Sequence, residues 1–500
     1  MKMTSKKKTE KNVYASRKFK YGTVAIVFTL IFCAFIILLN AVFSGISNYN
    51  GGFYLDLTSE QIYDISDITI EALSGLDQKV EIIFCKTEDR VDDDSALSYV
   101  KRLAEKYHNA NSNITLVFKD LIKDPVYFNQ FRKTETDTIS ESTVIINCPQ
   151  NKRYVTYSAQ NFFKFSSETG LVFAYDGENK LTSAIRQTAL NQIQKAAFIT
   201  GHGEEKRASV DTLLREQGYE VSDVDLKNIT EEELAEYDLL IISNPKYDYT
   251  GVSASAEGRV NEIGMLNNYL TKSFGNLMVF IGPEIPALEE FSNFLADDWG
   301  VSYNSGDIAV EGESMSLDIS GLYFLGTPNN QDSYGKSIHS SITSSGVQAT
   351  LFANATPLSV VFDQKAEKSV SPVYLTSQDS QVIRDGEVYS GANMPVMTLS
   401  VYSKLYDNTE YHSNVLVCGS VDYMNFVSEQ SFANADILKS AMSAMGNESI
   451  VTGIAYKVVD DTSITVTQDN FKRYTVMLST IVPVIIAVIG TIVYIKRKKA

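Results

Sequence analysis

One short motif holds residue types that could do chemistry: Gly201-His202-Gly203-Glu204 directly follows the apolar run 195–200. Its two glycines would let the backbone approach a ligand closely, and a histidine near a glutamate could bind a metal or act as acid and base. The same residues also fit a tight strand-to-helix turn, in which Glu204 favours the helix N-terminus through its dipole. Because the other histidines lie scattered along the chain, we favour a turn or a partner contact over catalysis.

Polar and glycine residues also follow other apolar runs. A glutaminase-type site needs a cysteine on a strand-to-helix elbow, but these runs end in Ser243-Asn244 and Gly282. Gly419-Ser420 with Asp422 can be interpreted as nucleophile and acid, although a loop after a buried strand is the simpler interpretation. The sequence has no Gly-x-x-x-x-Gly-Lys-[Ser/Thr] loop and no Gly-x-Ser-x-Gly elbow. We therefore predict no catalytic residue, cofactor or metal, and the candidates for ligand or partner binding are Gly201, His202, Gly203, Glu204, Asn244, Gly282 and Asp422.

The elements that would position these residues form two α/β blocks. In the first, 44–190, the pattern predicts a helix from Ser66 or Asp67, a strand at 79–85, a helix at 96–108 and strands at 113–120, 142–148 and 153–158. This β-α-β-α-β-β order is typical of a thioredoxin-like core. A redox version would need a second cysteine three residues after Cys85, where Glu88 stands, so we predict a scaffold or binding module.

The second block, 191–470, alternates near-continuous apolar strands with helices. Strands are predicted at 195–200, 219–226, 238–245, 276–283 and 413–420, and helices at 208–217, 230–234, 255–272, 286–298 and 434–445. Such a pattern predicts a doubly wound parallel sheet that is covered on both faces, with ligands at the carboxyl ends of its strands. The stretch 301–405 is richer in short strands and loops, and we interpret it as a β-rich insertion into the second block or an extension of it.

Two uncharged runs at 21–43 and 474–495 are long enough to cross a membrane, which takes about 20 residues. The basic ends at 1–20 and 496–500 predict that both termini are cytoplasmic, that the bulk of the chain is extracellular, and that the ends contact anionic lipid. A cleaved signal peptide is the alternative for the first run, but the run is longer than a typical signal sequence and no clean cleavage site follows it.

Charge and cysteine usage narrow the function further. The net charge of −17 argues against nucleic acid as a partner. The cysteines outside the first apolar run fit neither a zinc pattern nor a paired framework, so they are expected to be small buried hydrophobes, namely Cys85, Cys148 and Cys418.

With these residues in view, the chain resembles the gliding-motility-type (GldG-like) auxiliary components of ABC transporters. The resemblance rests on Asp56-Leu57-Thr58 after the first span, the thioredoxin-like block, KAAFITGHGEE at 195–205, the pair LLIISNP and NLMVFIGP, and VLVCGSVDYMNF before the second span. It implies a role beside a permease subunit and a separate cytoplasmic ATPase. It also implies that the second block is similar to class I glutamine amidotransferases without their catalytic cysteine.

Together these observations predict a non-enzymatic, membrane-anchored auxiliary subunit that binds a partner or substrate through its extracellular α/β domains. The main alternative is a membrane-anchored extracellular hydrolase or metal enzyme that uses His202, Glu204 and Asp422. A ligand sensor is a third possibility, but the short basic ends leave no room for a cytoplasmic output domain.

Overall fold

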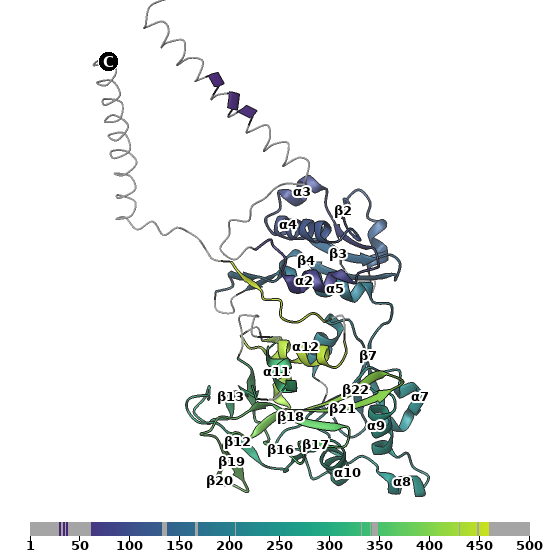
Figure 1. Cartoon of the computed structure of the whole chain (residues 1–500), viewed down its shortest axis with the longest axis vertical. Helices are drawn as coiled ribbons and strands as arrows, with labels where there is room; N and C mark the ends of the chain where they lie inside the picture. Colours follow the sequence, from purple (N-terminus) through teal and green to yellow (C-terminus); the bar gives the residue numbers. More distant parts are fainter. Residues whose placement is uncertain are drawn as a thin grey trace, which may run out of the picture. The chain divides into compact units, whose positions relative to one another are not determined.

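The computed structural model describes residues 62–459 apart from short gaps at 133–137, 166–168, 206, 332, 341, 343–348, 430 and 448–449 (Figure 1). Before residue 62 it describes only six residues between 30 and 38, all of them helical. The predicted second span, both basic ends and most of the predicted first span therefore lie outside the described residues. Within the described part of the chain, no helix is long and apolar enough to cross a membrane.

Residues 62–190 form the first α/β region. Its elements are α2 (Asp67–Ser74), β1 (Val80–Phe84), α3 (Glu88–Asp92), α4 (Ser95–Ala110), β2 (Ile114–Phe118), η2 (Tyr127–Phe131), β3 (Thr143–Cys148), β4 (Arg153–Ser158), η3 (Ala159–Phe162), β5 (Phe163–Phe165), β6 (Val172–Tyr175) and α5 (Gly177–Ala189). The four predicted strands of this block are confirmed as β1 to β4. Ser66 caps α2 by accepting a hydrogen bond from the Thr69 amide, as a helix N-cap serine does.

The sheet of the first region has the order β2-β1-β3-β4. β1 pairs with β2 in parallel and with β3 in antiparallel register, and β3 pairs with β4 in antiparallel register. The amphipathic helix α4 buries Leu97, Val100 and Leu103 in the same core as β1 and α5, because these residues recur at helical spacing on one face. Cys85 and Cys148 are fully buried with free thiols, as predicted.

The second region begins with β7. Its first half contains β7 (Lys195–Thr200), α6 (Ala208–Glu216), β8 (Glu220–Asp225), η4 (Leu226–Asn228), α7 (Glu231–Leu234), β9 (Leu239–Ser243), α8 (Val252–Ala256), α9 (Glu262–Thr271), β10 (Asn276–Phe280), α10 (Glu289–Asn293) and η5 (Phe294–Asp298). The bounds of β7 match the prediction. The single helix predicted over 255–272 is wrong: the chain forms α8 and α9 instead, separated by a turn in which Gly258 has a φ of +76°.

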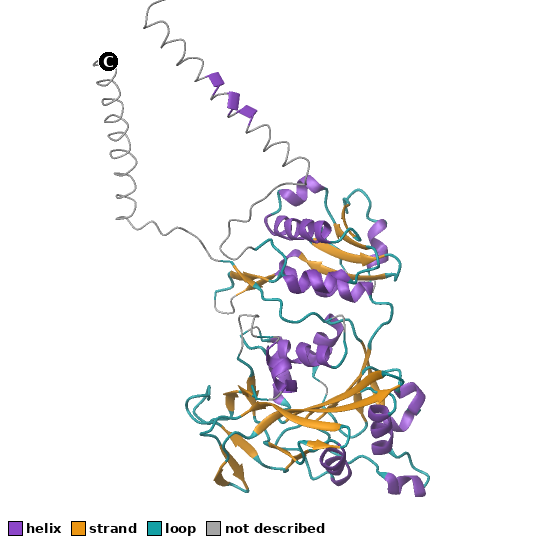
Figure 2. Ribbon diagram, viewed as in Figure 1, coloured by secondary structure: helices purple, strands orange, loops and turns teal. Residues whose placement is uncertain are grey.

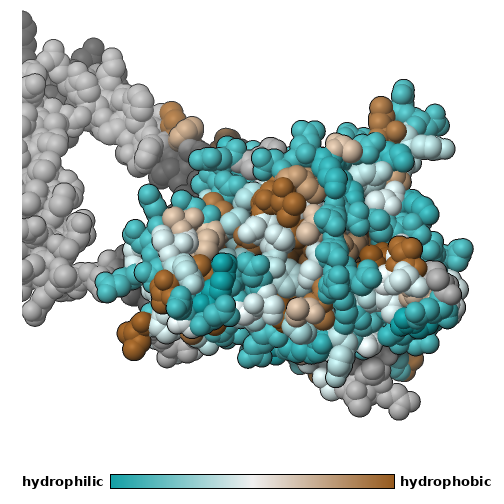
Figure 3. Space-filling view, turned by 90° about the horizontal axis from the view of Figure 1, so that it is seen from below, coloured by the Kyte–Doolittle hydropathy of each residue, from teal (hydrophilic) through white to brown (hydrophobic). Residues whose placement is uncertain are grey.

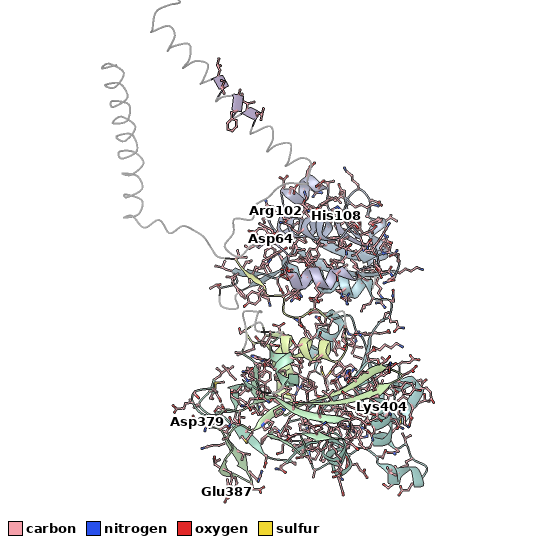
Figure 4. The ribbon with its side chains drawn as sticks, in the orientation of Figure 1. Asp64, Arg102, His108, Asp379, Glu387 and Lys404 are labelled. Atoms are coloured by element: carbon pink, nitrogen blue, oxygen red, sulfur yellow. The ribbon has the colours of Figure 1, made fainter. Side chains whose placement is uncertain are left out.

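The second half supplies most of the short strands. It contains β11 (Val301–Tyr303), β12 (Ile308–Val310), β13 (Tyr323–Leu325), β14 (Thr327–Pro328), α11 (Ser333–Ser340), β15 (Leu351–Ala353), β16 (Leu358–Val360), β17 (Gln364–Lys365), β18 (Lys368–Leu375), β19 (Gln381–Arg384), β20 (Glu387–Ser390), β21 (Pro395–Tyr406), β22 (Thr409–Cys418), η6 (Asp422–Ser428), α12 (Asn434–Ala444) and β23 (Lys457–Val458). The β-rich character of 301–405 is thus confirmed. The stretch carries many of the charged side chains on this part of the molecule, of which Asp379, Glu387 and Lys404 are labelled in Figure 4.

The main sheet of the second region has the order β14-β18-β21-β22-β10-β9-β7-β8. The five strands β22, β10, β9, β7 and β8 are parallel, whereas β18 and β21 join them in antiparallel register. The prediction of a parallel sheet is therefore wrong for its β14 side, where strands from the β-rich stretch join the sheet in antiparallel register. Of the two interpretations of this stretch, an insertion or an extension, these strands fit the extension. The coarser prediction of a mixed α/β fold is confirmed.

Both faces of this sheet are covered, as Figure 2 shows. Alternate residues of the parallel strands enter two different cores: Phe198 and Ile241 pack with α6 and α12, whereas Ile199 and Ile242 pack with α9 and α10. Strands that are buried on both faces need continuous apolar sequences, and this is why the pattern of the sequence indicated them so clearly.

Candidate functional site

The candidate residues follow the carboxyl ends of the parallel strands. Gly201 to Glu204 continue from β7, Asn244 follows β9, Gly282 lies two residues after β10, and Asp422 lies four residues after β22. From β7 the chain adds β8 on one side and then β9 on the other, so the strand order reverses between β7 and β9. Ligands of open α/β sheets bind at such a switch point, outside the carboxyl ends of the strands.

The glycines of the motif are required by the backbone. Gly201 has a φ of +111° and Gly203 a φ of +76°, in a region that residues with a Cβ adopt at a cost. A Cβ on Gly201 would lie 3.2 Å from a carboxylate oxygen of Asp225, and one on Gly203 would lie 3.1 Å from Cβ of Lys246. These contacts pack the motif against the loops that follow β8 and β9.

His202 is buried between two carboxylates. Its Nδ1 lies 3.3 Å from Oε1 of Glu204, and its Nε2 lies 3.2 Å from Oε1 of Glu262. The side chains of both glutamates are at most 3% exposed. We call Glu204, His202 and Glu262 the His202 triad. The Nε2 atom is also at hydrogen-bond distance, 3.2 Å, from Oε2 of Glu262, whereas Nδ1 has an ion-pair contact with Glu204 and no hydrogen bond.

The electrostatics of the triad favour the imidazolium ion. Burial by itself would lower the pKa of His202, but the polar contacts and charges of Glu204 and Glu262 outweigh it and raise the pKa to about 9. Burial opposes ionisation of the glutamates too, yet the contacts with His202 hold the pKa of each below its ordinary value. At neutral pH the ring is therefore a cation, with no lone pair for a metal ion or for accepting a proton.

Other side chains complete the triad. The Tyr249 ring stacks on His202 at a centroid distance of 4.0 Å and donates its hydroxyl proton to Glu204 Oε1 over 2.7 Å. Thr250 donates to Glu262 Oε2 from its amide over 2.9 Å and from its hydroxyl over 2.8 Å. Lys227 Nζ lies 3.8 Å from Glu262 Oε1. Through Tyr249 and Thr250, the triad thus holds the segment 246–261 in place.

The loops after β7 and β9 are also joined through their backbones. The amides of Lys246 and Tyr247 both donate to the carbonyl of His202, over 2.8 and 3.0 Å. In the opposite direction, the Glu205 amide donates to the Ser243 carbonyl over 2.8 Å. Backbone hydrogen bonds therefore join the two loops that flank the switch point.

A second polar chain links Asn244 to Asp422. Asn244 has a φ of +48° and donates from Nδ2 to Glu205 Oε1 over 3.0 Å. Glu205 pairs with Arg207 at 2.6 Å, and Arg207 lies 3.9 Å from Asp422 Oδ1. Gly282 lies beside this chain, because a Cβ there would be 3.1 Å from the side chain of Val421. The seven candidates thus share one edge of the sheet. Asp422, however, contacts Arg207, which is linked to Asn244 through Glu205, and it does not contact the His202 triad.

Five buried polar atoms at this edge lack a hydrogen-bond partner within the described part of the chain: His202 Nδ1, Arg207 Nε, Ser243 Oγ, Asn244 Oδ1 and Glu262 Oε1. The side chains of His202, Arg207 and Glu262 lie in ion pairs, whereas Ser243 and Asn244, at 1% and 2% exposed, have no charged partner for these atoms. Native structures rarely leave such atoms unsatisfied, and a small polar ligand or a water is the usual partner. The prediction that this edge binds a ligand stays open, and the atoms of Ser243 and Asn244 mark where it would bind.

Glu262 was not among the site residues predicted from the sequence. It was visible in the spacing, because Glu262 shares a helical stripe with the buried residues Met265, Leu266, Tyr269 and Leu270. A carboxylate on the core face of a helix requires a partner, so this position predicts a buried ion pair. Nothing in the local pattern indicates that the partner is His202, because 60 positions separate the two.

The described residues contain no group of three or more His, Cys, Asp or Glu side chains that could hold a metal ion. The Cys418 thiol lies in β22 beneath the same edge and is fully buried. Burial raises the pKa of Cys418 to about 12, and the same effect raises that of Cys85 to about 12. Neither thiol forms a nucleophilic thiolate near neutral pH.

Comparisons with known proteins give only distant structural neighbours. No family model matches the chain, and a search of curated proteins finds no match. The mmIFT52 N-terminal domain is similar at a TM-score of 0.36 and 17% identity, over 50% of this chain and 97% of that one. A ThuA-like protein from Bacteroides uniformis gives 0.32 and 11%, over 50% and 91%. A glutamine amidotransferase from Thermotoga maritima gives 0.24 and 9%, over 52% and 92%. These scores are low, so the fold described above rests on its own strand order and register.

Proposed function

We propose that this chain is a non-enzymatic auxiliary subunit of an ABC transporter complex, anchored by the two apolar runs at 21–43 and 474–495. In this proposal both basic ends are cytoplasmic and contact lipid, and the thioredoxin-like and amidotransferase-like blocks are extracellular. They bind a permease subunit, while a separate ATPase supplies the energy in the cytoplasm.

The observation that supports a binding role most strongly is the internal use of the GHGE motif. His202 is held as a cation by Glu204 and Glu262, and its backbone carbonyl accepts two hydrogen bonds from the loop after β9. Side chains that are buried in ion pairs with each other are poorly placed to turn over a substrate, but they are well suited to hold a loop in one conformation.

The loop that the triad holds presents apolar side chains to solvent. Tyr247 is 70% exposed and Val252 is 76% exposed, while Tyr249 between them is buried against His202. Interfaces commonly place aromatic and aliphatic anchors among polar side chains. Figure 3 shows one face of the molecule, on which separate brown patches lie between teal side chains. We therefore propose the segment 246–261 as the contact for the permease.

Affinity isolation of the full chain from its native membranes tests the proposal. We expect a permease and an ATP-binding subunit to co-purify with it, and a Tyr247→Asp, Val252→Asp variant to lose them at an unchanged protein level. The matched control is Leu405→Asp, Tyr406→Asp on the tip of the β21–β22 hairpin, where both side chains are also exposed. Isolation that yields neither a permease nor an ATPase would reject the proposal.

The same material separates this function from the alternative, a membrane-anchored hydrolase or metal enzyme. The unsatisfied atoms of Ser243 and Asn244 are the observation that favours a small-molecule site. If His202→Ala and Glu204→Ala leave the complex and the protein level intact but abolish a measurable turnover, the enzyme is the correct interpretation. Loss of protein level and of complex together indicates the structural role proposed here.

A further inference from the structure

A buried glutamate in the first region contacts two segments from opposite ends of the described chain. Glu178, in the first turn of α5, is 4% exposed. Its Oε1 accepts hydrogen bonds from the Ser66 amide over 2.6 Å, the Ser66 hydroxyl over 2.6 Å and the Thr69 hydroxyl over 2.7 Å. One carboxylate oxygen is thus occupied by the leading segment, 62–70, which follows the predicted first span.

The other carboxylate oxygen contacts the returning segment, 456–459, which precedes the predicted second span. Lys457 Nζ lies 3.3 Å from Glu178 Oε2, and it also donates to the Asp64 carbonyl. Asp64 and Lys457 are separated by 393 positions in the sequence. The carboxylate and the ammonium group therefore join the beginning and the end of the described chain directly.

Backbone pairing and packing support this contact. Lys457 and Val458 form β23, which pairs in antiparallel register with Tyr175 and Ala174 of β6, and the Val459 amide donates to the Phe173 carbonyl over 3.0 Å. Ile62 and Val459 both pack on the core of the first region. Figure 1 shows the yellow β23 returning to this region, and Figure 4 labels Asp64 there.

We propose that four residues, which we call the Glu178 clasp, link the leading segment to the returning segment: Ser66, Thr69, Glu178 and Lys457. The clasp joins the two ends of the first region, so that the leading and returning segments move together. In this arrangement the chain leaves the first region after α5, forms the second region and returns to the first region at β23. A displacement of either segment acts on the other through Glu178 and β23. This inference concerns contacts within the chain and does not depend on the transport role.

Hydrogen–deuterium exchange of the full chain tests the clasp, because local opening appears as faster exchange of the amides concerned. In Glu178→Gln, which keeps the side-chain shape, we expect exchange about tenfold faster at the amides of 66–70 and of 457–459 together. In Lys457→Met, which removes the ammonium group of the returning segment and leaves Ser66, Thr69 and Glu178 in place, we expect exchange at the amides of 66–70 to accelerate as well.

Two matched variants in the same region serve as controls. Glu81→Gln removes a carboxylate that accepts a bond from Asn147, and Lys119→Met removes an ion pair with Asp124. Both should leave exchange at 66–70 and 457–459 unchanged. The clasp is rejected if Lys457→Met accelerates only its own segment, or if Glu178→Gln accelerates neither. Should Glu178→Gln fail to fold, Lys457→Met alone still decides the question.

Discussion

The two α/β regions each bury a glutamate that pairs with a cation, but the two sites join different segments. The Glu178 clasp connects segments 393 positions apart through a lysine and three hydroxyl or amide donors. The His202 triad connects the loop after β7 with the start of α9 through an imidazole ring between two glutamates. The comparison shows that one interaction can set the topology of a region or the conformation of a loop, depending on which segments supply the partners.

The largest effect should come from removing the cation of the triad. His202→Ala leaves Glu204 and Glu262 buried beside each other, and breaking a buried ion pair from one side costs about 3–5 kcal/mol. The only tryptophan, Trp299, is fully buried in the core that also holds Tyr249, so its fluorescence during denaturant unfolding reports on the second region.

Two substitutions outside the triad, one in each region, serve as controls for this measurement. His412→Ala, at a half-exposed site on β22, should change the Trp299 transition by less than about 0.5 kcal/mol. Glu178→Gln should also leave that transition in place, because it acts on the first region. A loss below about 1 kcal/mol for His202→Ala would mean that the triad is not a buried ion network.

The next effect is a pH dependence that only the triad should show. The pKa of His202 is about 9 in the folded chain, above its ordinary value of 6.5, so the folded state binds its proton more tightly. The stabilisation is fully present below pH 6.5, decreases as the pH rises, and is lost above about 9, with a total on the order of 3 kcal/mol. The Trp299 transition should weaken over this window in the native chain and stay level in His202→Gln. A native chain whose stability is flat from pH 6.5 to 9 would contradict the raised pKa.

The local pattern of the sequence predicted the elements of both regions better than their connections. Runs such as 195–200 and 276–283 could be identified as strands because burial on both faces requires apolar residues throughout. β23 has only two residues, and its pairing with β6 depends on contacts across nearly the whole chain, which a local pattern does not encode. The antiparallel addition of β18 and β21 was missed for the same reason.

The candidate site shows the same division. Gly201, His202, Gly203 and Glu204 could be identified from their residue types next to a strand. Their chemistry depends on Glu262 and Tyr249, which come from a different helix and loop, and these partners convert an apparent base into a fixed cation. Residue type indicates what a group can do in water, whereas its partners decide its charge in the fold.

A smaller effect should distinguish the cost of a strained backbone from the cost of a packing clash in the loops around the His202 triad. Gly203 and Gly258 both have a φ of +76°, but a Cβ would meet Lys246 at 3.1 Å only at Gly203, with nothing within 4 Å at Gly258. Alanine at either site pays the cost of a left-handed backbone, about 1–2 kcal/mol. Gly203→Ala should cost more than Gly258→Ala in the Trp299 transition. Equal costs would show that the loop after β9 can move away freely and is not held by the triad.

The smallest effect should come from Lys227, the lysine beside the triad. This effect can be compared directly with that of Lys457 in the Glu178 clasp. The Lys227 side chain is 47% exposed and lies 3.8 Å from Glu262, whereas that of Lys457 is 17% exposed and lies 3.3 Å from Glu178. Water and salt screen an exposed pair, so Lys227→Met should cost less than about 1 kcal/mol, and its effect should vanish in high salt. Lys457→Met should retain its effect on exchange at 66–70 under the same salt, because its partner is buried. If both effects disappear together in salt, the clasp is a surface contact like that of Lys227, and the distinction between the two clusters fails.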